Sequence, residues 1–388
     1  MNVARIVTDT YKAGNEVVVV VSAQGDTTDD LIEKAQEINH NASRREKDML
    51  LAAGEQISIS LLAMAIEKLG YQAVSLLGWQ AGFETTSAHT SARIKRVDAS
   101  RIRRELDKKN IVVVAGFQGT DSKGDPVTLG RGGSDTSAVA LAGALKADAC
   151  EIYTDVDGIY SADPRIIPDA RKMKEITYDE MLEMARLGAG VMQPRSVEMG
   201  KYFNIPIHVR STFTSKPGTM IREAYTMEEK DFLIRGVAHD NNVAKIAVLG
   251  VPNNPGIAHT IFAALAEKNI AVDMIVQSIR NIEKNVTDMV FTTTLDDLPE
   301  AKKVVDSVAE KLHAVAVLIE EDVAKVSIVG AGMLGNPGIA SRMFGALSDA
   351  EVNIDAISTS EISISCLIKG NQLNEAANAI HKEFFPEK

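Results

Sequence analysis

Residues 16–38 read EVVVVVSAQGDTTDDLIEKAQEI, and this stretch decides the fold class of the N-terminal half. Its five consecutive valines are apolar toward both faces, which is typical of a strand in a parallel sheet covered by helices on both sides. A Gly-Asp turn follows the valines, and residues 28–38 then show the spacing of a helix. The stretch therefore predicts a strand–loop–helix unit of an α/β sheet.

The same alternation of strand-like and helical patterns extends to residue 210. Helical spacing recurs at residues 43–69, 134–145 and 178–186. The further strand-like runs are AVSLL (73–77), IVVVAG (111–116), ACEIYTD (149–155) and IPIHVR (205–210). Strands that alternate with longer helices predict an α/β fold, a three-layer helix–sheet–helix sandwich around one mostly parallel sheet.

Length and composition narrow the class of protein. A chain of 388 residues predicts two or three domains, and a net charge of −11 argues against nucleic-acid binding. The N-terminus holds no apolar segment typical of a signal peptide, and no run approaches transmembrane length. Cys150 and Cys366 lie far apart in apolar runs, which is typical of reduced core residues. We expect a cytoplasmic, soluble protein that binds neither nucleic acid nor membrane.

An internal repeat occupies the C-terminal part of the chain. Residues 250–278, GVPNNPGIAHTIFAALAEKNIAVDMIVQS, match residues 332–360, GMLGNPGIASRMFGALSDAEVNIDAISTS. The two NPGIA pentads start at Asn254 and Asn336, 82 residues apart. Each copy shows the order strand, turn, helix, strand, strand, helix. The repeat therefore predicts two similar α+β modules of ferredoxin-like topology.

The two modules are unequal at their ends. The first finishes with the strand AVAVLIEE (314–321), whereas the second stops at its last helix. The run FLIRGVAHD (232–240), just before the first module, can supply the strand that the second one lacks. We infer that the first module is inserted within the second; a C-terminal helix without a final strand is the alternative.

The domain boundaries follow from this insertion and from a polar linker with Pro-Gly at residues 211–230. The expected domains are residues 1–230, residues 243–320 for the first module, and residues 231–242 plus 321–388 for the second.

A glycine pattern at residues 326–335, VSIVGAGMLG, has the form of a dinucleotide fingerprint. Too few residues follow it for a dinucleotide-binding domain, and the first copy of the repeat lacks the glycine spacing. We therefore do not expect a dinucleotide there.

Polar residues suited to an anionic ligand follow several of the predicted strands. Hydroxyls of Ser22, Thr27 and Thr28 precede a helix start, where N–H groups favour an anion, although a simple helix cap by Asp26 or Thr27 explains this loop equally well. Glu55 is a lone carboxylate in an apolar helix and needs a cation, from a ligand or from an internal arginine. The loop GRGGSD (130–135) carries Arg131, whose planar guanidinium suits a carboxylate or phosphate.

These loops belong together if they follow strands of one parallel sheet, because ligands bind at the carboxyl edge of such sheets. A further loop, IYTDVDGIYSADPR (152–165), follows another strand and lacks the acid spacing of a calcium loop. It is reasonable as a loop around a nucleotide.

SAQGDTTD, AAGEQIS, GFQGTDSKGDPVTLGRGGSDTSA, EIYTDVDGIYSADPR and GAGVMQPRSVE, in this order before the paired NPGIA modules, strongly resemble the aspartokinases. The resemblance covers essentially the whole chain. It implies the amino acid kinase fold and ATP-dependent phosphorylation of the L-aspartate side chain, the first step toward lysine, threonine and methionine. It also implies two regulatory ACT domains, the second of which is interrupted by the first.

The resemblance assigns roles residue by residue. Arg131 with Gly132, Gly133, Ser134 and Asp135 would bind L-aspartate, aided by Glu55, Thr27 and Thr28. Ser22 would face the nucleotide phosphates, and Tyr153, Thr154, Tyr160, Asp163 and Arg165 would line the ATP site. Mg²⁺ would arrive on the ATP phosphates with few protein ligands, so no metal site of the protein itself is expected.

The resemblance also implies feedback by lysine, threonine or both, and a homo-oligomer or αβ oligomer formed through the ACT domains. The effector residues would be Asn253, Gly256, Ala258, Asp273 and Gln277 in the first module, with Ile339, Ala340, Asn353, Ile354, Ser360 and Glu361 in the second.

Two departures from the family pattern bear on activity. The family begins with a strand and a K-F-G-G-T-S motif whose lysine contacts ATP, and this sequence has no such motif. Gly190 stands where many members have lysine. We therefore expect little aspartate-dependent ATP consumption from these 388 residues and marginal kinase-domain stability, whereas the ACT half should fold. A non-catalytic effector-binding subunit or pseudokinase, and a kinase for another acidic amino acid, are the alternatives.

Overall fold

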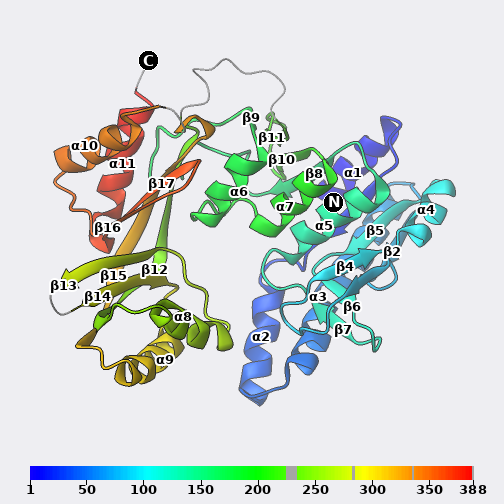
Figure 1. Cartoon of the computed structure of the whole chain (residues 1–388). Coiled ribbons are helices and arrows are strands. Elements are labelled where there is room, and N and C mark those ends of the chain that lie inside the picture. Colours follow the sequence, from blue (N-terminus) through cyan, green and yellow to red (C-terminus); the bar gives the residue numbers. More distant parts are fainter. Residues whose placement is uncertain (224–233, 282–284, 334–335, 387–388) are drawn as a thin grey trace. The chain divides into compact units, whose positions relative to one another are not determined.

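The computed structural model describes residues 1–223, 234–281, 285–333 and 336–386. Residues 224–233 lie outside the described part. They include the last residues of the predicted linker and the first two residues of the predicted strand 232–240. The chain divides into two compact units (Figure 1). Unit 1 comprises Met1–Ile159, Lys172–Ala185 and Gly190–Tyr225, and unit 2 comprises Tyr160–Arg171, Arg186–Ala189 and Thr226–Lys388.

The valine run of the N-terminal half forms an edge strand of a parallel three-stranded sheet. The order is β1 (Val18–Val21), β5 (Ile111–Ala115) and β2 (Ala73–Leu76). One face packs against α1 (Asn2–Lys12) and α3 (Arg44–Lys68), and the other against α4 (Ser100–Asp107) and α5 (Gly133–Leu145). The continuous apolar strands thus have helices on both faces, as the three-layer prediction required.

The expected single sheet is divided in the described residues. A second sheet pairs β8 (Cys150–Thr154) in parallel with β10 (Ile207–Ser211). It continues antiparallel to β11 (Thr219–Ile221) and then parallel to β9 (Glu175–Ile176). No ladder joins β1 to β8 among the described strands; instead α5 packs against both of them. A shared helix, rather than backbone pairing, therefore connects the two sheets.

The other elements of unit 1 flank these sheets. A small sheet has the order β4 (Ile94–Val97), β3 (Phe83–Thr85), β6 (Gln118–Thr120) and β7 (Pro126–Thr128). The remaining helices are α2 (Thr27–Ile38), α6 (Tyr178–Arg186) and α7 (Pro194–Phe203). The predicted helices at 28–38, 43–69, 134–145 and 178–186 are all present within one residue at each end.

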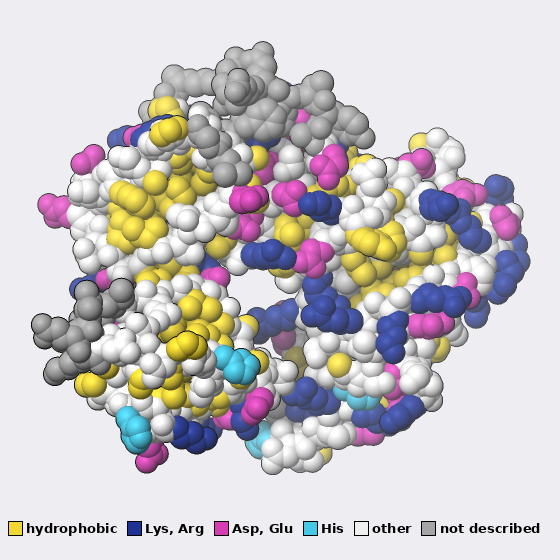
Figure 2. All heavy atoms as spheres, in the orientation of Figure 1, with side chains coloured by type: hydrophobic (Ala, Val, Ile, Leu, Met, Phe, Trp, Pro, Cys, Tyr) yellow, Lys and Arg dark blue, Asp and Glu magenta, His cyan; other side chains and the backbone are white. Residues whose placement is uncertain are grey.

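A basic surface covers α4 and the neighbouring β4. Eight lysines and arginines lie between Arg93 and Lys109, and Figure 2 shows Lys and Arg side chains gathering over this part of unit 1. Ile102 and Leu106 of α4 are buried in the core, so the charges occupy the solvent side of an amphipathic helix.

Helix α3 corrects the expectation that no run approaches transmembrane length. It has 25 residues and is long and apolar enough, by length and composition alone, to cross a membrane. However, Asp48, Glu55 and Ser58 are buried along it, and its apolar residues pack on the β1–β5–β2 sheet. A core helix of a soluble protein passes the same test.

Unit 2 is built on one antiparallel six-stranded sheet (Figure 1). Two long strands lie at its centre, β12 (Gly236–Pro252) and β15 (Ala316–Val329). The order is β13 (Ile275–Asn281), β14 (Val286–Thr293), β12, β15, β17 (Ser363–Lys369) and β16 (Ala356–Thr359). The helices are α8 (Ile257–Glu267), α9 (Leu298–Lys311), α10 (Ile339–Asp349) and α11 (Leu373–Phe384), with short 3₁₀ turns at Ala331–Met333 and Gly370–Gln372.

Each long strand serves both modules of the repeat. Residues Gly236–Asp240 of β12 pair with Lys325–Val329 of β15, which also pair with β17 of the second module. The later part of β12 pairs with β14 of the first module. The strand that the sequence analysis moved into the second module therefore lies there, although the exact domain boundaries remain a proposal.

One segment of unit 2 comes before residue 230, where the sequence predicted the end of the first domain. Tyr160–Arg171 belongs to unit 2 by its contacts, because Ala162 and Ile167 are buried in the core of the second module. The buried Ser161 hydroxyl lies 2.9 Å from Nε2 of His381 on α11.

Candidate functional site

The carboxyl ends of β1 and β5 bring three predicted site segments together in unit 1. The Gly116 N–H donates to the Val21 carbonyl across the two strands, at 3.0 Å. The Ala23 N–H donates to Oε1 of Glu55 on α3, at 3.1 Å. A Cβ on Gly116 would lie 2.8 Å from the Ser134 hydroxyl at the start of α5. Residues far apart in sequence thus meet at the expected edge of the sheet.

Glu55 is a buried carboxylate without a cation. Its side chain is 3% exposed, and Oε2 is buried with no hydrogen-bond partner among the described residues. Burial raises the pKa of Glu55 to about 7, against the opposing effect of backbone N–H groups. An internal arginine was considered as its partner, but no described arginine forms an ion pair with Glu55. One oxygen of this carboxylate is therefore left unsatisfied among the described residues.

The approach of α3 to the β1 loop depends on Gly54. A Cβ there would lie 2.9 Å from Cβ of Ala23 and 3.6 Å from a Thr27 methyl group. Glycine therefore allows Glu55 to reach the loop that carries Ser22 and Thr27.

The turn before α5 is shaped by glycines in the left-handed region. Gly130 has φ +78° and Gly132 has φ +66°, and α5 begins at Gly133. The first N–H groups of a helix lack intrahelical partners and favour an anion. The exposed Arg131 makes no hydrogen bond or ion pair with any described residue. Burial raises the pKa of Asp135, in the first turn of α5, to about 6.

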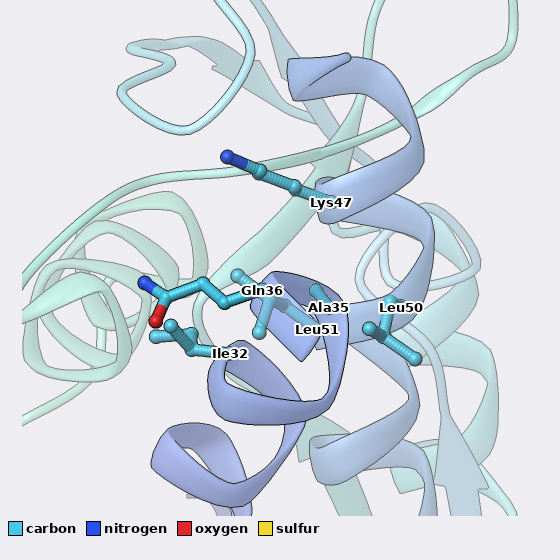
Figure 3. Close-up of a pocket in the computed structure, with 6 residues that line it drawn as sticks. All are labelled: Ile32, Ala35, Gln36, Lys47, Leu50 and Leu51. Atoms are coloured by element: carbon cyan, nitrogen blue, oxygen red, sulfur yellow. The ribbon is translucent and has the colours of Figure 1, made fainter. Parts of the chain in front are cut away.

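Thr27 and Thr28 begin α2, and neither Thr27 nor Asp26 caps the helix with its side chain. The Thr27 hydroxyl instead donates to the Gln24 carbonyl at 2.6 Å. No α2 residue is fully buried, and a cavity of about 50 Å³ separates α2 from α3. Figure 3 shows its lining of Ile32, Ala35, Gln36, Lys47, Leu50 and Leu51. α2 is therefore lightly packed, and the cavity is too small for a substrate.

Tyr153 and Thr154 lie at the carboxyl end of β8 in unit 1. The Tyr153 hydroxyl donates to Glu151 Oε2 at 2.9 Å, and the Arg210 guanidinium lies 5.6 Å from its ring centre. Burial, and then the Glu151 carboxylate, raises the pKa of Tyr153 to about 12. The Thr154 hydroxyl contacts the neighbouring Asp155 carboxylate at 2.9 Å.

Tyr160, Asp163 and Arg165 lie on the segment that belongs to unit 2. The Arg165 guanidinium donates to both oxygens of Asp163, with the shortest contact at 2.7 Å. This contact lowers the pKa of Asp163. The Arg165 side chain is 88% exposed, so it is accessible despite the pairing. Gly190, at the position discussed for a lysine, is also exposed.

One group of described residues could hold a metal ion by distance, namely His89, Asp121 and Asp125. All three already have protein partners. His89 Nδ1 lies 2.8 Å from Asp48, Asp121 accepts N–H groups of its own turn, and Asp125 pairs with Arg45.

The predicted effector residues lie mostly on the surface of unit 2. Gly256 and its counterpart Gly338 both have a left-handed φ, +97° and +103°, at the starts of α8 and α10. Asn253, Ala258, Gln277, Asn353, Ser360 and Glu361 are exposed, and Ala340 and Ile354 are half-buried. Ile339 is buried in the core of the second module, so its side chain does not face a surface pocket.

Asp273 has a partner that the sequence analysis missed. The buried Lys325 of β15 forms an ion pair with it, and the equivalent Lys245 of β12 lies 3.5 Å from Asp355. A lysine of each module therefore lies beside the equivalent aspartate of the other module.

Four further residues shape the site and were also missed. Phe117 has φ +66°, and its N–H donates to the Ser137 hydroxyl at 3.1 Å. Gln193 covers Gly132, Arg195 donates to Leu129, and Asp48 binds Thr128. No short-range sequence signal points to these contacts, since each joins segments distant in the chain.

The chain resembles known proteins over almost its whole length. The model of the amino acid kinase family matches residues 1–211, and an ACT domain model matches residues 246–308 and 326–384. The aspartokinase of Mycolicibacterium smegmatis is 50% identical over 387 residues, covering 98% of this chain and 91% of that protein. The chain belongs to the aspartokinases of the amino acid kinase family.

Solved structures agree with this membership. Escherichia coli aspartokinase III in complex with aspartate and ADP has a TM-score of 0.82 at 24% identity, covering 99% of this chain and 96% of that one, which supports the fold. The same enzyme in complex with lysine and aspartate has a TM-score of 0.73 at 25% identity, covering 99% and 95%. The alternatives of a non-catalytic subunit and of a kinase for another amino acid are not favoured.

Proposed function

We propose that this chain transfers the γ-phosphoryl group of ATP to the side-chain carboxylate of L-aspartate, with the groups around β1, β5, α3 and α5 holding the amino acid. The observation that carries the proposal is the pair of complementary features in unit 1. Among the described residues, Glu55 has a buried oxygen without a partner, and Arg131 has an unpaired guanidinium beside a helix N-terminus.

The charges of aspartate match these groups. Its ammonium group is the cation that Glu55 lacks, and a carboxylate suits the planar fork of Arg131. Gly132, Gly133, Ser134 and Asp135 bring the backbone close to that carboxylate, while Thr27 and Thr28 add hydroxyls from α2. Burial of Glu55 makes its ion pair with a ligand strong, because the pair is shielded from water.

The nucleotide roles rest on the family pattern. Ser22 faces the phosphates, and Tyr153 and Thr154 contact ATP from the end of β8. The same pattern assigns Tyr160, Asp163 and Arg165 to ATP. Mg²⁺ enters with the ATP phosphates and neutralises their charge. Phosphoryl transfer needs little covalent help from the protein, so these residues act by positioning both substrates and stabilising charge.

Lysine, threonine or both are proposed as effectors of the ACT modules, by analogy with the lysine complex of the E. coli enzyme. We also propose that the chain forms an oligomer through these modules. A cytoplasmic location fits the same set of relatives.

Replacement of Arg131 by alanine tests the substrate assignment. Loss of one charged contact should cost on the order of 10²–10³ in kcat/KM for aspartate. The KM for aspartate should rise far more than that for ATP. Aspartyl phosphate is measured as its hydroxamate, and the aspartate Kd by calorimetry, so that binding is reported even if turnover is slow. If the variant binds aspartate as tightly as the unaltered protein, Arg131 is a surface cation that does not bind the substrate.

A further inference from the structure

Arg195, in the first turn of α7, has an unusual environment for a cation. It is half-buried, its Nη1 donates to the Leu129 carbonyl at 2.8 Å, and its Nη2 donates to the Ala92 carbonyl at 3.1 Å. Burial lowers the pKa of Arg195, the charge of Arg93 adds to this effect, and Glu198 on the same helix opposes it. A partly desolvated guanidinium that donates to two backbone carbonyls costs free energy to place there, so its position calls for an explanation.

The two acceptors lie at the entrance to the glycine turn. Leu129 directly precedes Gly130, and its own N–H donates to the Phe117 carbonyl at 2.9 Å. The Ala92 N–H donates to the Thr128 carbonyl at 3.0 Å. Because a guanidinium presents its donors in a rigid plane, Arg195 fixes both carbonyls, and hence the direction in which the turn leaves β7.

The same helix end also limits the turn directly. A Cβ on Gly132 would lie 1.7 Å from Cγ of Gln193, the residue that caps α7. The start of α7 is therefore packed on the turn at Gly132 while Arg195 holds its entrance.

A buried anion holds the opposite side. Asp48 of α3 is fully buried and accepts the Thr128 hydroxyl at 2.6 Å and the Thr90 N–H at 3.0 Å. Gly130 packs against Thr90, since a Cβ on Gly130 would lie 3.1 Å from the Thr90 carbonyl oxygen. The turn thus leaves a strand end that is fixed by one charged residue from α3 and one from α7.

We infer that Arg195 is a positioning residue for the amino-acid substrate. It acts through the backbone of Leu129 and sets the Gly130–Gly133 turn so that Arg131 and the start of α5 face the substrate carboxylate. This role rests on the proposed function of that turn and extends it to a residue outside the turn.

The test compares Arg195→Met and Arg195→Lys with the unaltered protein, by calorimetric titration with aspartate and, separately, with Mg·ATP. Misplacement of the turn in Arg195→Met should weaken aspartate binding on the order of 10- to 100-fold and leave the ATP Kd unchanged. Lysine should recover part of the loss, since an ammonium can reach one carbonyl but cannot span both.

Arg93→Met is the matched control. Arg93 is exposed and close enough to lower the Arg195 pKa, but it donates no side-chain hydrogen bond to the turn. Its removal deletes the same unit of charge without the contacts, so aspartate binding should stay as in the unaltered protein.

Three results would rule out the positioning role of Arg195. Unchanged aspartate affinity in Arg195→Met, an equal loss for aspartate and ATP, or the same loss in Arg93→Met would each overturn the positioning role. Thermal unfolding of each variant shows whether the fold persists, and Arg195→Lys provides the comparison if the methionine variant does not fold. Failure of the unaltered protein to bind aspartate would instead contradict the proposed function.

Discussion

At the scale of single residues, Glu55 and Asp48 show how two buried carboxylates on one helix have different uses. Asp48 accepts hydrogen bonds from Thr128 and Thr90 and contacts His89, so its charge is satisfied within the fold. Glu55 accepts one N–H and keeps its second oxygen unpartnered among the described residues. A buried, unsatisfied acceptor is costly, and its retention indicates a ligand.

The pKa of Glu55 gives a prediction for pH dependence. With a pKa of about 7, the carboxylate form needed by a substrate ammonium is lost as the pH falls through neutrality. The kcat/KM for aspartate, which reports the free enzyme, should therefore decline below about pH 7. Glu55→Gln should remove this decline and weaken aspartate binding on the order of 10- to 100-fold, as expected for one lost ionic hydrogen bond. Aspartate kinetics and calorimetric titration with aspartate, at pH values about one to two units on either side of this pKa, measure the two effects.

Protein stability supplies the control for the same variant. A raised carboxyl pKa means that the folded state binds a proton more tightly than the unfolded chain, so the Glu55 carboxylate destabilises the fold as the pH rises. Glu55→Gln should therefore unfold at a higher temperature than the unaltered protein at alkaline pH, with the difference shrinking in acid. If the variant is less stable than the unaltered protein at every pH, Glu55 stabilises the fold by packing and its carboxylate is not kept for a ligand.

At the scale of elements, the sequence predicted helices and strands well because they depend on local pattern. The four valines of β1 and the apolar helix α3 lie where the sequence pattern predicted a strand and a helix. The division into two sheets could not be predicted, since it depends on which distant strands pair. The contacts of Arg195 and Gln193 with the glycine turn were missed for the same reason, as they join residues some 60 to 100 positions apart.

The glycine turn yields a prediction about backbone conformation. Gly132→Ala must hold an alanine at φ +66°, and its Cβ would overlap the Gln193 side chain. The left-handed conformation alone costs about 1–2 kcal/mol, and the overlap adds displacement of α7 or of the turn. We expect aspartate binding to be lost while ATP binding persists, as measured by calorimetry.

Gly124→Ala is the matched control for that variant. Gly124 has φ +86° in the β6–β7 connection, but nothing lies within 4 Å of the position of its Cβ. It should show the conformational cost in thermal unfolding without a loss of aspartate affinity. Equal aspartate affinity in both alanine variants would contradict the role given to the turn.

At the scale of the whole chain, the two modules could be predicted because the same sequence motif occurs twice. The NPGIA pentads revealed two modules, and their unequal ends predicted that residues 232–240 supply a strand to the second module. Residues 236–240 pair there with the part of β15 that also pairs with β17. The fusion of neighbouring strands into the long β12 and β15 was not predicted. The exchanged lysines were not predicted either, because Lys325 and Lys245 reach Asp273 and Asp355 only once the two strands lie side by side.

The effector proposal makes a prediction about unit 2. Lysine or threonine binds through its ammonium and carboxylate groups, and a ligand that binds only the folded state raises the unfolding temperature. At a concentration about 100 times Kd, the stabilisation is about 2.7 kcal/mol, which is readily measured by calorimetric scanning. We expect a concentration-dependent rise with lysine, threonine or both, tested separately and together, and no rise with valine, whose side chain has neither the ammonium group of lysine nor the hydroxyl of threonine.

Gln277 tests where that effector binds. It is exposed on β13, in register with Met289, and its loss should leave the unfolding temperature of the ligand-free protein nearly unchanged. Gln277→Ala should reduce the shift caused by the effector, since a lost neutral hydrogen bond of about 1 kcal/mol weakens binding roughly fivefold. Glu375→Gln changes an exposed residue of α11, a helix that carries none of the predicted effector residues; it is the control and should keep the full shift. If neither amino acid stabilises the protein, the ACT modules do not bind these effectors; if Gln277→Ala keeps the full shift, the effector binds elsewhere in unit 2.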